Sequence, residues 1–584
     1  MCEAVRRSGT FRAAALIALF VAVTQSPAFA AAVEGPTPQP LSFAEPVRGR
    51  LEAGESRRFS FEAEAGDFVY GMIDSPIAGG LIGTIVGPRG SQVRTTRGGL
   101  LSFVAPEHGR YELRLSNAAE RAGSFAFVLD ATRTLESSSP AAQEILSPLI
   151  QEQAQRLAAG QADTDEFWAS IAKDGTPLVE RVEDDFVVTL LWRGNAETRS
   201  VKATWSLFHV SPVIELARLG TSDIWFRSFR FPPGARFTYQ MVPDPPIVQG
   251  PAMVRALALM SVAQADPLNI RSGSSGANER LSSMSLLELP PGVAASGWTK
   301  VRAEVAKGEL TSFELTSDIT KDTRVVSVYT PAGYDRRCGP YGLLMLLDGS
   351  AYKSLIPVPT ILDNLISAGR IPPMIAVFVD NSSVRGRAAQ MYPNAAFTEM
   401  VASELMTRIR SQYAVTNEPR DAVIGGFSLG GLAATHIAWR RPDVFGAVLS
   451  QSGSFWWSSK AIDAGRGEPI LSEGPLLDPR IESFELVSMI AAAPKAPIRL
   501  YLEAGLYEGD LLTANRFMRD VLSAKGYEFS YREFPGGHDG AFWRESFADG
   551  LLSLMGSQSA SLPASCGAAA DSQAARTQPS APRK

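Results

Sequence analysis

The stretch Asp421-Ala-Val-Ile-Gly-Gly-Phe-Ser-Leu-Gly-Gly-Leu432 decides the fold of this 584-residue chain. Residues 422–426 form an apolar run typical of a buried strand, and a helix-like run follows at residues 429–441. Between the two runs lies the G-x-S-x-G pattern of a sharp strand-to-helix turn that exposes a serine. The stretch therefore predicts an α/β domain in which Ser428 is a nucleophile and the amide of Leu429 faces the same space.

The base that activates this serine is predicted from the order of the four histidines. Only His436 and His538 follow Ser428, and the histidine comes last in α/β-hydrolases. His436 lies eight residues along the same helix-like run, so it rises about 12 Å from the serine and is out of reach. His538 lies in a glycine-rich loop after the strand-like run 527–534, and it is the predicted base.

The acid that orients the histidine is expected after the preceding strand, residues 498–502. Glu508 is the preferred candidate because it lies in the loop that follows this strand. Glu503, near the strand end, and Asp510 remain as alternatives.

Two backbone amides are expected to form an oxyanion hole. Leu429 supplies the first. The second is expected from the loop after the strand-like run 343–347, where Gly349 allows a close approach and Ser350 is an alternative.

The surrounding residues, 295–556, alternate apolar strand-like runs with helix-like runs such as residues 397–413. This alternation predicts a mostly parallel sheet covered by helices. The strands are expected at residues 324–329, 343–347, 374–379, 422–426, 444–450 and 498–502.

Two β-sandwich domains are predicted upstream of the α/β domain. Residues 41–130 combine short alternating runs with frequent turn signals, and residues 165–290 contain further β-like runs rich in tryptophan. A polar, helical linker is expected between them at residues 131–164. The chain is thus predicted to be multidomain, with a C-terminal α/β-hydrolase fold preceded by two β-sandwiches.

Both ends of the chain are predicted to lie outside the folded domains. Residues 1–30 combine basic residues, a short apolar core and Ala28-Phe-Ala30, which together predict a cleavable signal peptide cut after Ala30 and a periplasmic or secreted protein. The apolar core is too short to span a bilayer, and no later run is longer. Residues 557–584 are rich in Ser, Ala, Pro and Gln and predict a disordered tail.

Composition narrows the classes of partner. A net charge of −5 gives no reason to expect nucleic-acid binding. No Cys/His cluster has metal-ligand spacing, so neither a metal nor another cofactor is expected. Export permits a disulfide between Cys338 and Cys566, and the sequence leaves open whether they pair.

Longer motifs carry a family resemblance over residues 165–556. The run Phe445-Gly-Ala-Val-Leu-Ser-Gln-Ser-Gly-Ser-Phe-Trp-Trp457 resembles the enterochelin esterase branch of the esterase D-like hydrolases. Three further stretches are similar to the same family: Leu347-Asp-Gly349, Leu502-Glu-Ala-Gly505 and Gly536-Gly-His-Asp539-Gly-Ala-Phe-Trp543. Residues 41–130 loosely resemble bacterial β-domains of the pre-peptidase C-terminal type, with motifs such as Gly87-Pro-Arg-Gly90.

The resemblance implies a small-molecule ester substrate, the trilactone of a catecholate siderophore such as enterobactin, free or iron-loaded. It also implies a substrate-contacting arginine, which corresponds to Arg387, with Arg385 as a weaker candidate. A guanidinium suits an anionic ferric triscatecholate, and a structural ion pair is the alternative role for Arg387. Trp456 and Trp457 are candidates for contact with a catechol ring or for packing of the pocket wall.

The sequence leaves three functional hypotheses. The leading one is a periplasmic serine esterase acting on a catecholate siderophore. In the family, a Glu-Leu pair follows the substrate-contacting arginine, and here Gln390-Met391 stands in its place, which leaves the identity of the substrate open. The second hypothesis therefore keeps the same triad and changes the substrate to a feruloyl, acetyl or other acyl ester of a carbohydrate. The third is a non-catalytic siderophore- or glycan-binding protein on a hydrolase scaffold, which the pairing of Ser428 with His538 disfavours.

Overall fold

The computed structural model describes residues 37–556, except 76–80, 98, 120–121, 136–142, 162, 207–212, 250–251, 272–283, 291–296, 383–385 and 461–483. The predicted signal peptide and the predicted C-terminal tail lie outside the described residues.

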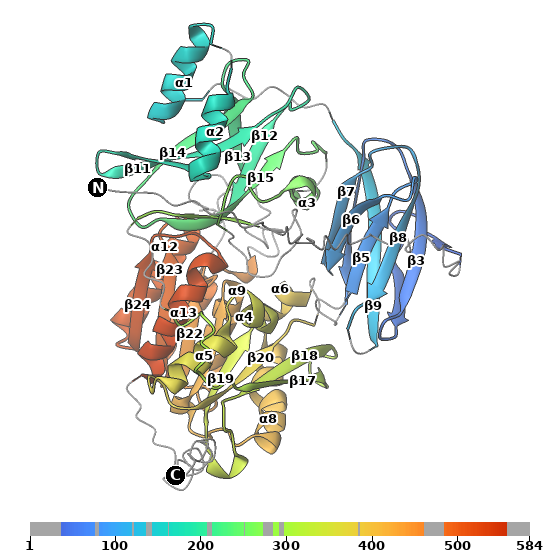
Figure 1. Cartoon of the computed structure of the whole chain (residues 1–584). Coiled ribbons are helices and arrows are strands. Elements are labelled where there is room, and N and C mark those ends of the chain that lie inside the picture. The colour runs from blue at the N-terminus through green and yellow to red at the C-terminus, as the bar shows by residue number, and fades with distance from the viewer. Residues whose placement is uncertain are drawn as a thin grey trace, which may run out of the picture.

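The first unit consists of two facing β-sheets, drawn in blue in Figure 1. One sheet has the strand order β1-β3-β8-β5-β6 and the other β2-β9-β4-β7. Side chains from both sheets meet in one core, where the rings of Phe59 and Phe127 lie 5.1 Å apart. The strands are β1 (Gln39–Pro40), β2 (Val47–Leu51), β3 (Ser56–Ala63), β4 (Asp67–Asp74), β5 (Leu81–Val86), β6 (Gln92–Arg97), β7 (Gly99–Val104), β8 (Gly109–Asn117) and β9 (Gly123–Arg133).

The second unit is built on a single seven-stranded antiparallel sheet of order β10-β11-β14-β13-β12-β15-β16. Its elements are α1 (Pro148–Ala158), α2 (Asp165–Asp174), β10 (Leu178–Val182), β11 (Asp185–Arg193), β12 (Val201–Trp205), β13 (Val213–Arg218), β14 (Ile224–Phe231), β15 (Arg236–Pro243), α3 (Ala252–Val262) and β16 (Ser285–Glu288).

This seven-stranded sheet curls over its own core. Strands β14 and β15 stand three positions apart in the sheet, which is about 14 Å in a flat sheet. The rings of Phe231 at the end of β14 and Phe237 on β15 nevertheless lie 5.2 Å apart, and Trp205 packs against both. The curled sheet thus encloses an aromatic core of the kind that the tryptophan-rich sequence predicts.

The first unit is docked on the second through an apolar contact. Phe68 on β4 is fully buried and packs with Val254 and Leu257 of α3. The chain also forms a bridge between Leu135 and Ile247 at this junction. The blue unit therefore rests against the second unit by burial of side chains as well as through the chain connection.

The third unit is a doubly covered α/β domain with the sheet order β17-β18-β20-β19-β21-β22-β23-β24 (Figure 1). Strands from β20 to β24 run parallel, whereas β17 and β18 pair antiparallel at one edge. The core on one face includes residues of α8, α9 and α12, and the core on the other face includes residues of α4, α5 and α13. Because parallel strands place their carboxyl ends at one edge, residues that follow several strands can meet there.

The strands of this domain are β17 (Glu309–Thr316), β18 (Thr323–Thr330), β19 (Gly342–Leu347), β20 (Met374–Val379), β21 (Ala422–Phe427), β22 (Ala447–Gln451), β23 (Arg499–Gly505) and β24 (Glu528–Phe534). The helices are a 3₁₀ turn (Arg336–Cys338), α4 (Gly349–Ser354), α5 (Val358–Ser367), α6 (Gly386–Met391), α7 (Ala395–Glu399), a π-helical segment (Met400–Leu405), α8 (Met406–Gln412), a 3₁₀ turn (Pro419–Asp421), α9 (Leu429–Arg440), α11 (Glu485–Ala492), α12 (Asp510–Ala524) and α13 (Gly540–Met555).

Some predicted elements differ from those observed. The single helix expected at residues 397–413 is divided into α7, the π-helical segment and α8. Strand β22 begins at Ala447 instead of residue 444, because the chain turns after α9 and the Gly446 amide bonds to the Pro419 carbonyl.

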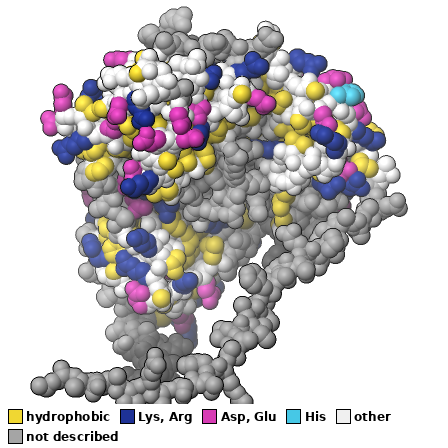
Figure 2. Space-filling view, turned by 45° about the horizontal axis from the view of Figure 1, so that its top comes forward, with side chains coloured by type: hydrophobic (Ala, Val, Ile, Leu, Met, Phe, Trp, Pro, Cys, Tyr) yellow, Lys and Arg dark blue, Asp and Glu magenta, His cyan; other side chains and the backbone are white. Residues whose placement is uncertain are grey.

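The described surface is mixed in charge. Figure 2 shows lysine and arginine side chains intermingled with aspartate and glutamate over the face turned to the viewer. Among the residues that the structure describes, no helix is long and apolar enough to cross a membrane.

Candidate active site

Ser428 stands at a tight turn between strand β21 and helix α9. Its backbone has φ 55° and ψ −123°, a conformation that L-residues adopt rarely and at a cost in strain. A Cβ atom on Gly426 would lie 2.3 Å from the backbone of Gly430, so the chain can cross itself here only because residue 426 is glycine. The turn lifts the serine side chain beyond the end of the sheet.

The described structure brings Ser428, His538 and Glu508 into one hydrogen-bonded row. His538 Nε2 lies 2.9 Å from Ser428 Oγ, and His538 Nδ1 lies 3.2 Å from Glu508 Oε1. The Glu508 side chain is fully buried, and that of His538 is 8% exposed. The carboxylate fixes the tautomer in which Nδ1 carries the proton, so Nε2 is left to accept the serine proton.

The three candidate acids lie in different surroundings. Glu503 lies within β23, which extends to Gly505, and its carboxylate accepts hydrogen bonds from Gln451, Tyr501 and Ser546. Burial raises the pKa of Glu503 to about 7. Asp510 begins helix α12. Among the three, the structure brings only Glu508 to His538.

The loop that follows β19 lies directly beside the serine turn. Asp348 has φ 57° and precedes α4, so Gly349 is the first residue of that helix. A Cβ on Gly430 would lie 3.2 Å from Asp348 Oδ2, which shows how closely the loop and the turn approach. Gly349 and Leu429 each begin a helix, so their amides have no acceptor within it and can face an anionic oxygen.

Arg387 on α6 makes a two-pronged ion pair with Asp348. Its Nε and Nη2 atoms each lie 2.7 Å from a different carboxylate oxygen, and Asn381 donates a further hydrogen bond to Oδ1. Arg387 therefore contacts the loop that carries Gly349. This ion pair is the structural role predicted from the sequence as the alternative to substrate contact. Arg385 lies outside the described residues.

The two tryptophans differ in their packing. Trp456 is 1% exposed and lies within the core on the α9 side of the sheet. Trp457 is 6% exposed and its ring stacks on Tyr392 at 6.1 Å. This burial favours packing over ligand contact, most clearly for Trp456.

Several site residues were not found by reading the sequence. Ser454 Oγ lies 3.4 Å from Ser428 Oγ, and the Trp543 ring meets His538 edge-to-face at 4.9 Å. Both belong to motifs that carried the family resemblance, so a signal for them was present in the sequence. Asp539 is bonded to Ser206 and Thr238, more than 300 positions earlier in the chain, and no local pattern marks that contact.

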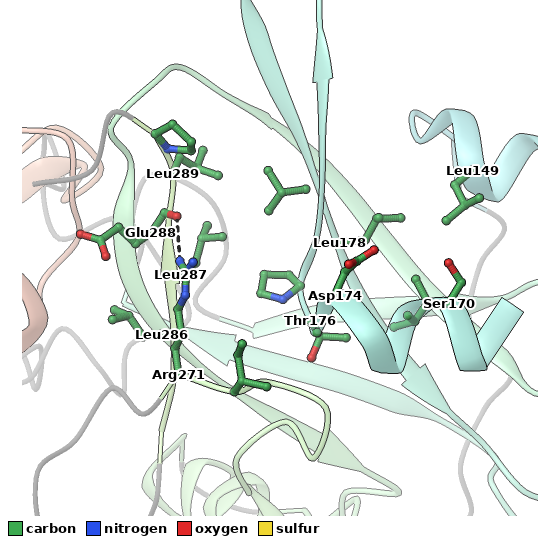
Figure 3. Close-up of a pocket in the computed structure, with 16 residues that line it drawn as sticks. Leu149, Ser170, Asp174, Thr176, Leu178, Arg271, Leu286, Leu287, Glu288 and Leu289 are labelled. Carbon is green, nitrogen blue, oxygen red and sulfur yellow. Dashed lines mark hydrogen bonds between the residues drawn. The ribbon is translucent and has the colours of Figure 1, made fainter. Parts of the chain in front are cut away.

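A cavity of about 580 Å³ lies apart from this site, in the second unit between α2, β10 and β16 (Figure 3). Leucines and Thr176 border it, with Asp174 on one side and Arg271 bonded to the Glu288 carbonyl on the other. None of the three residues of the hydrogen-bonded row lines it.

Within the described residues, no group of His, Cys, Asp and Glu is arranged to hold a metal ion. Cys338 is disulfide-bonded, and Cys566, whose pairing with it the sequence left open, lies outside the described residues.

Comparison with known proteins covers both C-terminal units. A family described as "Putative esterase" matches residues 317–554, and one described as "Enterochelin esterase, N-terminal" matches residues 187–298. Both matches support assignment of the chain to the enterochelin esterase family.

Relatives of this esterase align over almost their whole length. The iron(III) enterobactin esterase of Dickeya dadantii is 28% identical over 427 residues, which cover 68% of this chain and 94% of that protein. The enterobactin esterase FES of Shigella flexneri, solved in the presence of enterobactin, is 26% identical with a TM-score of 0.52 and covers 67% of this chain and 97% of its own. The ferric enterobactin esterase of Salmonella typhimurium is 26% identical with a TM-score of 0.53, covering 67% and 98%.

The esterase family match and these relatives indicate that the protein is a carboxylic-ester hydrolase. The purely binding protein considered from the sequence is thereby set aside. The first β unit lies before the residues that both family models cover.

Proposed function

We propose that this protein is a periplasmic serine esterase that hydrolyses the trilactone ester bonds of a catecholate siderophore, free or iron-loaded. The observation that carries the proposal is the Glu508–His538–Ser428 row, in a chain that spans 97% of an esterase solved with enterobactin. The predicted signal peptide at residues 1–30 supports the periplasmic location. We also propose that residues 41–130 and 165–290 form two β-sandwich domains and that residues 295–556 form the α/β-hydrolase domain.

Acylation begins at Ser428. Its Oγ attacks the lactone carbonyl carbon while His538 Nε2, 2.9 Å away, takes the serine proton. The carboxylate of Glu508 stabilises the imidazolium that forms. His538 then returns the proton to the departing alkoxide oxygen of the lactone, which opens the ring and leaves an acyl group on Ser428.

The negative oxygen of each tetrahedral intermediate is held by two amides. The donors are the N–H groups of Leu429 and Gly349, whose loops lie side by side. Arg387 stabilises this arrangement through its two hydrogen bonds to Asp348. Water, deprotonated by His538, then attacks the acyl carbonyl and frees the serine.

Product analysis tests the proposed substrate. Free enterobactin, ferric enterobactin and a feruloyl sugar ester are incubated separately with the purified protein and with Ser428→Ala, and the products are separated by chromatography. The proposal predicts linear trimer, dimer and monomer from enterobactin, with no products from Ser428→Ala. Cleavage of the feruloyl ester while both forms of enterobactin survive would overturn the siderophore assignment and support the carbohydrate-ester alternative.

A further inference from the structure

The loop that carries His538 is bound to the seven-stranded sheet of the second unit. The His538 N–H donates to the Ser206 carbonyl oxygen at 2.8 Å, and the Arg236 N–H donates to the Pro535 carbonyl oxygen at 2.9 Å. Arg236 also forms an isolated parallel bridge with Gly536. The main chain of His538 and of the residues just before it is therefore hydrogen-bonded to another folding unit.

The side chain next to the histidine joins the same two units. Asp539 Oδ2 accepts hydrogen bonds from the Ser206 hydroxyl, the Thr238 N–H at 2.8 Å and the Thr238 hydroxyl at 3.1 Å. Asp539 Oδ1 accepts from the Ala541 N–H at 2.8 Å and caps helix α13. Ser206 is 7% exposed and Thr238 is 2% exposed, so little water competes for these bonds.

We propose that Ser206 and Thr238 are positioning residues for the general base. Through Asp539 they fix the loop from Pro535 to Asp539, and so set the place of His538 relative to Ser428 and Glu508. The inference rests on the proposed triad mechanism and extends it, because it gives the second unit a part in turnover. The second unit then supports the catalytic histidine in addition to any contact it makes with substrate.

Physical reasons favour an effect on rate over an effect on binding. Neither hydroxyl is bonded to Ser428, His538 or Glu508 side chains, so each acts only through Asp539. Hydrogen bonds from buried donors to a carboxylate are strong and directional. Displacement of a catalytic group by about 1 Å can lower turnover by about 10²-fold, whereas a distant substrate contact is unaffected.

Hydroxyl-removing variants of the full-length protein test the proposal. Ser206→Ala and Thr238→Val each remove one donor and leave the backbone donor and acceptor of the same residue in place. Turnover of p-nitrophenyl butyrate is expected to fall about fivefold in each and about 30-fold in the double variant, with KM changed less than about twofold. Ser206→Thr retains the hydroxyl and is expected to restore most of the loss seen in Ser206→Ala.

A matched control separates positioning from general weakening of the second unit. Thr189 and Ser228 share a buried hydroxyl–hydroxyl bond of 2.8 Å in the same sheet and make no bond to the His538 loop. Thr189→Val removes a buried hydroxyl of the same kind, and we expect it to lower the melting temperature while kcat stays near wild type. Equal losses of kcat in Thr189→Val and in the Ser206→Ala/Thr238→Val double variant would overturn the proposal.

Labelling of the serine by a fluorophosphonate gives a second readout that needs no ester substrate. The double variant is expected to react about 30-fold more slowly than wild type, because the reaction also requires the aligned base. A labelled wild type together with an equally fast double variant would overturn this inference alone. A wild type that neither reacts at Ser428 nor hydrolyses esters would overturn the proposed mechanism, and the inference with it.

Discussion

Replacement of Glu508 by glutamine is expected to remove most of the turnover of this esterase while leaving its fold intact. The side chain is fully buried, and its Oε1 atom lies 3.2 Å from His538 Nδ1. Glutamine keeps the size of the side chain and one oxygen acceptor. The substitution therefore removes one negative charge from beside the imidazole and little else.

The expected loss follows from that charge. In the proposed mechanism His538 becomes an imidazolium in each transition state, and opposite unit charges 3.2 Å apart attract by about 5 kcal/mol at an effective dielectric constant of about 20. Since each 1.36 kcal/mol corresponds to a tenfold change in rate, kcat is expected to fall by between about 10³-fold and 10⁴-fold. The neutral assay substrate, p-nitrophenyl butyrate, is bound before this charge forms, so its KM should change little.

Glu503→Gln is the matched control for this substitution. Glu503 is also a fully buried glutamate, five positions earlier on β23, but it is bonded to Gln451, Tyr501 and Ser546 instead of the histidine. Initial rates of p-nitrophenyl butyrate hydrolysis are measured for both variants over a range of substrate concentrations. We expect kcat of Glu503→Gln to stay within about threefold of wild type.

The reverse result would refute the assignment of the acid. If Glu503→Gln lost turnover by orders of magnitude while Glu508→Gln remained active, the carboxylate that orients His538 would be Glu503. If neither variant lost turnover, the account of imidazolium stabilisation would be wrong. Circular dichroism and melting curves recorded alongside distinguish both outcomes from simple unfolding.

Three further predictions concern the surroundings of the triad. Gly349→Ala places a Cβ 2.7 Å from the backbone of Phe378, and the resulting displacement of the oxyanion amide is expected to lower kcat by about 10²-fold in the same ester assay. Arg387→Lys cannot keep both 2.7 Å contacts to Asp348, so kcat should fall about tenfold with KM for enterobactin nearly unchanged; a rise in KM alone would instead indicate direct contact with the substrate. Burial raises the pKa of Glu503 to about 7 from 4.5, so the folded state holds this proton more tightly than the unfolded state and stability falls as pH rises from about 4.5 to about 8. In denaturant titrations Glu503→Gln should remove about 3 kcal/mol of that fall, and an unchanged pH dependence would contradict the raised pKa.

The α/β unit could be predicted well because its strands are apolar on both faces. The expected strand at residues 374–379 coincides with β20, and the run 422–426 is one residue shorter than β21. The division of the helix expected at residues 397–413 could not be predicted, since it arises from packing of the π-helical segment against the core. The curl of the seven-stranded sheet likewise depends on contacts between strands that are not neighbours in that sheet.

The site shows the same division between local and distant information. Ser428 and His538 could be singled out from the elbow pattern and from the order of the histidines. Glu508 and Glu503 could not be separated by pattern alone, because the partners that bind Glu503 include Ser546, which lies 43 positions away. The contact of Asp539 with Ser206 spans 333 positions and depends wholly on how two units pack.

Trapping of the acyl-enzyme tests the central claim most directly. The protein is mixed with enterobactin, quenched in acid within the first turnovers, digested and analysed by mass spectrometry. The account predicts a peptide containing Ser428 that carries an ester-linked fragment of the siderophore, and no such adduct in Ser428→Ala. Hydrolysis of enterobactin by Ser428→Ala at the wild-type rate, or an acyl group found on a different residue, would contradict it.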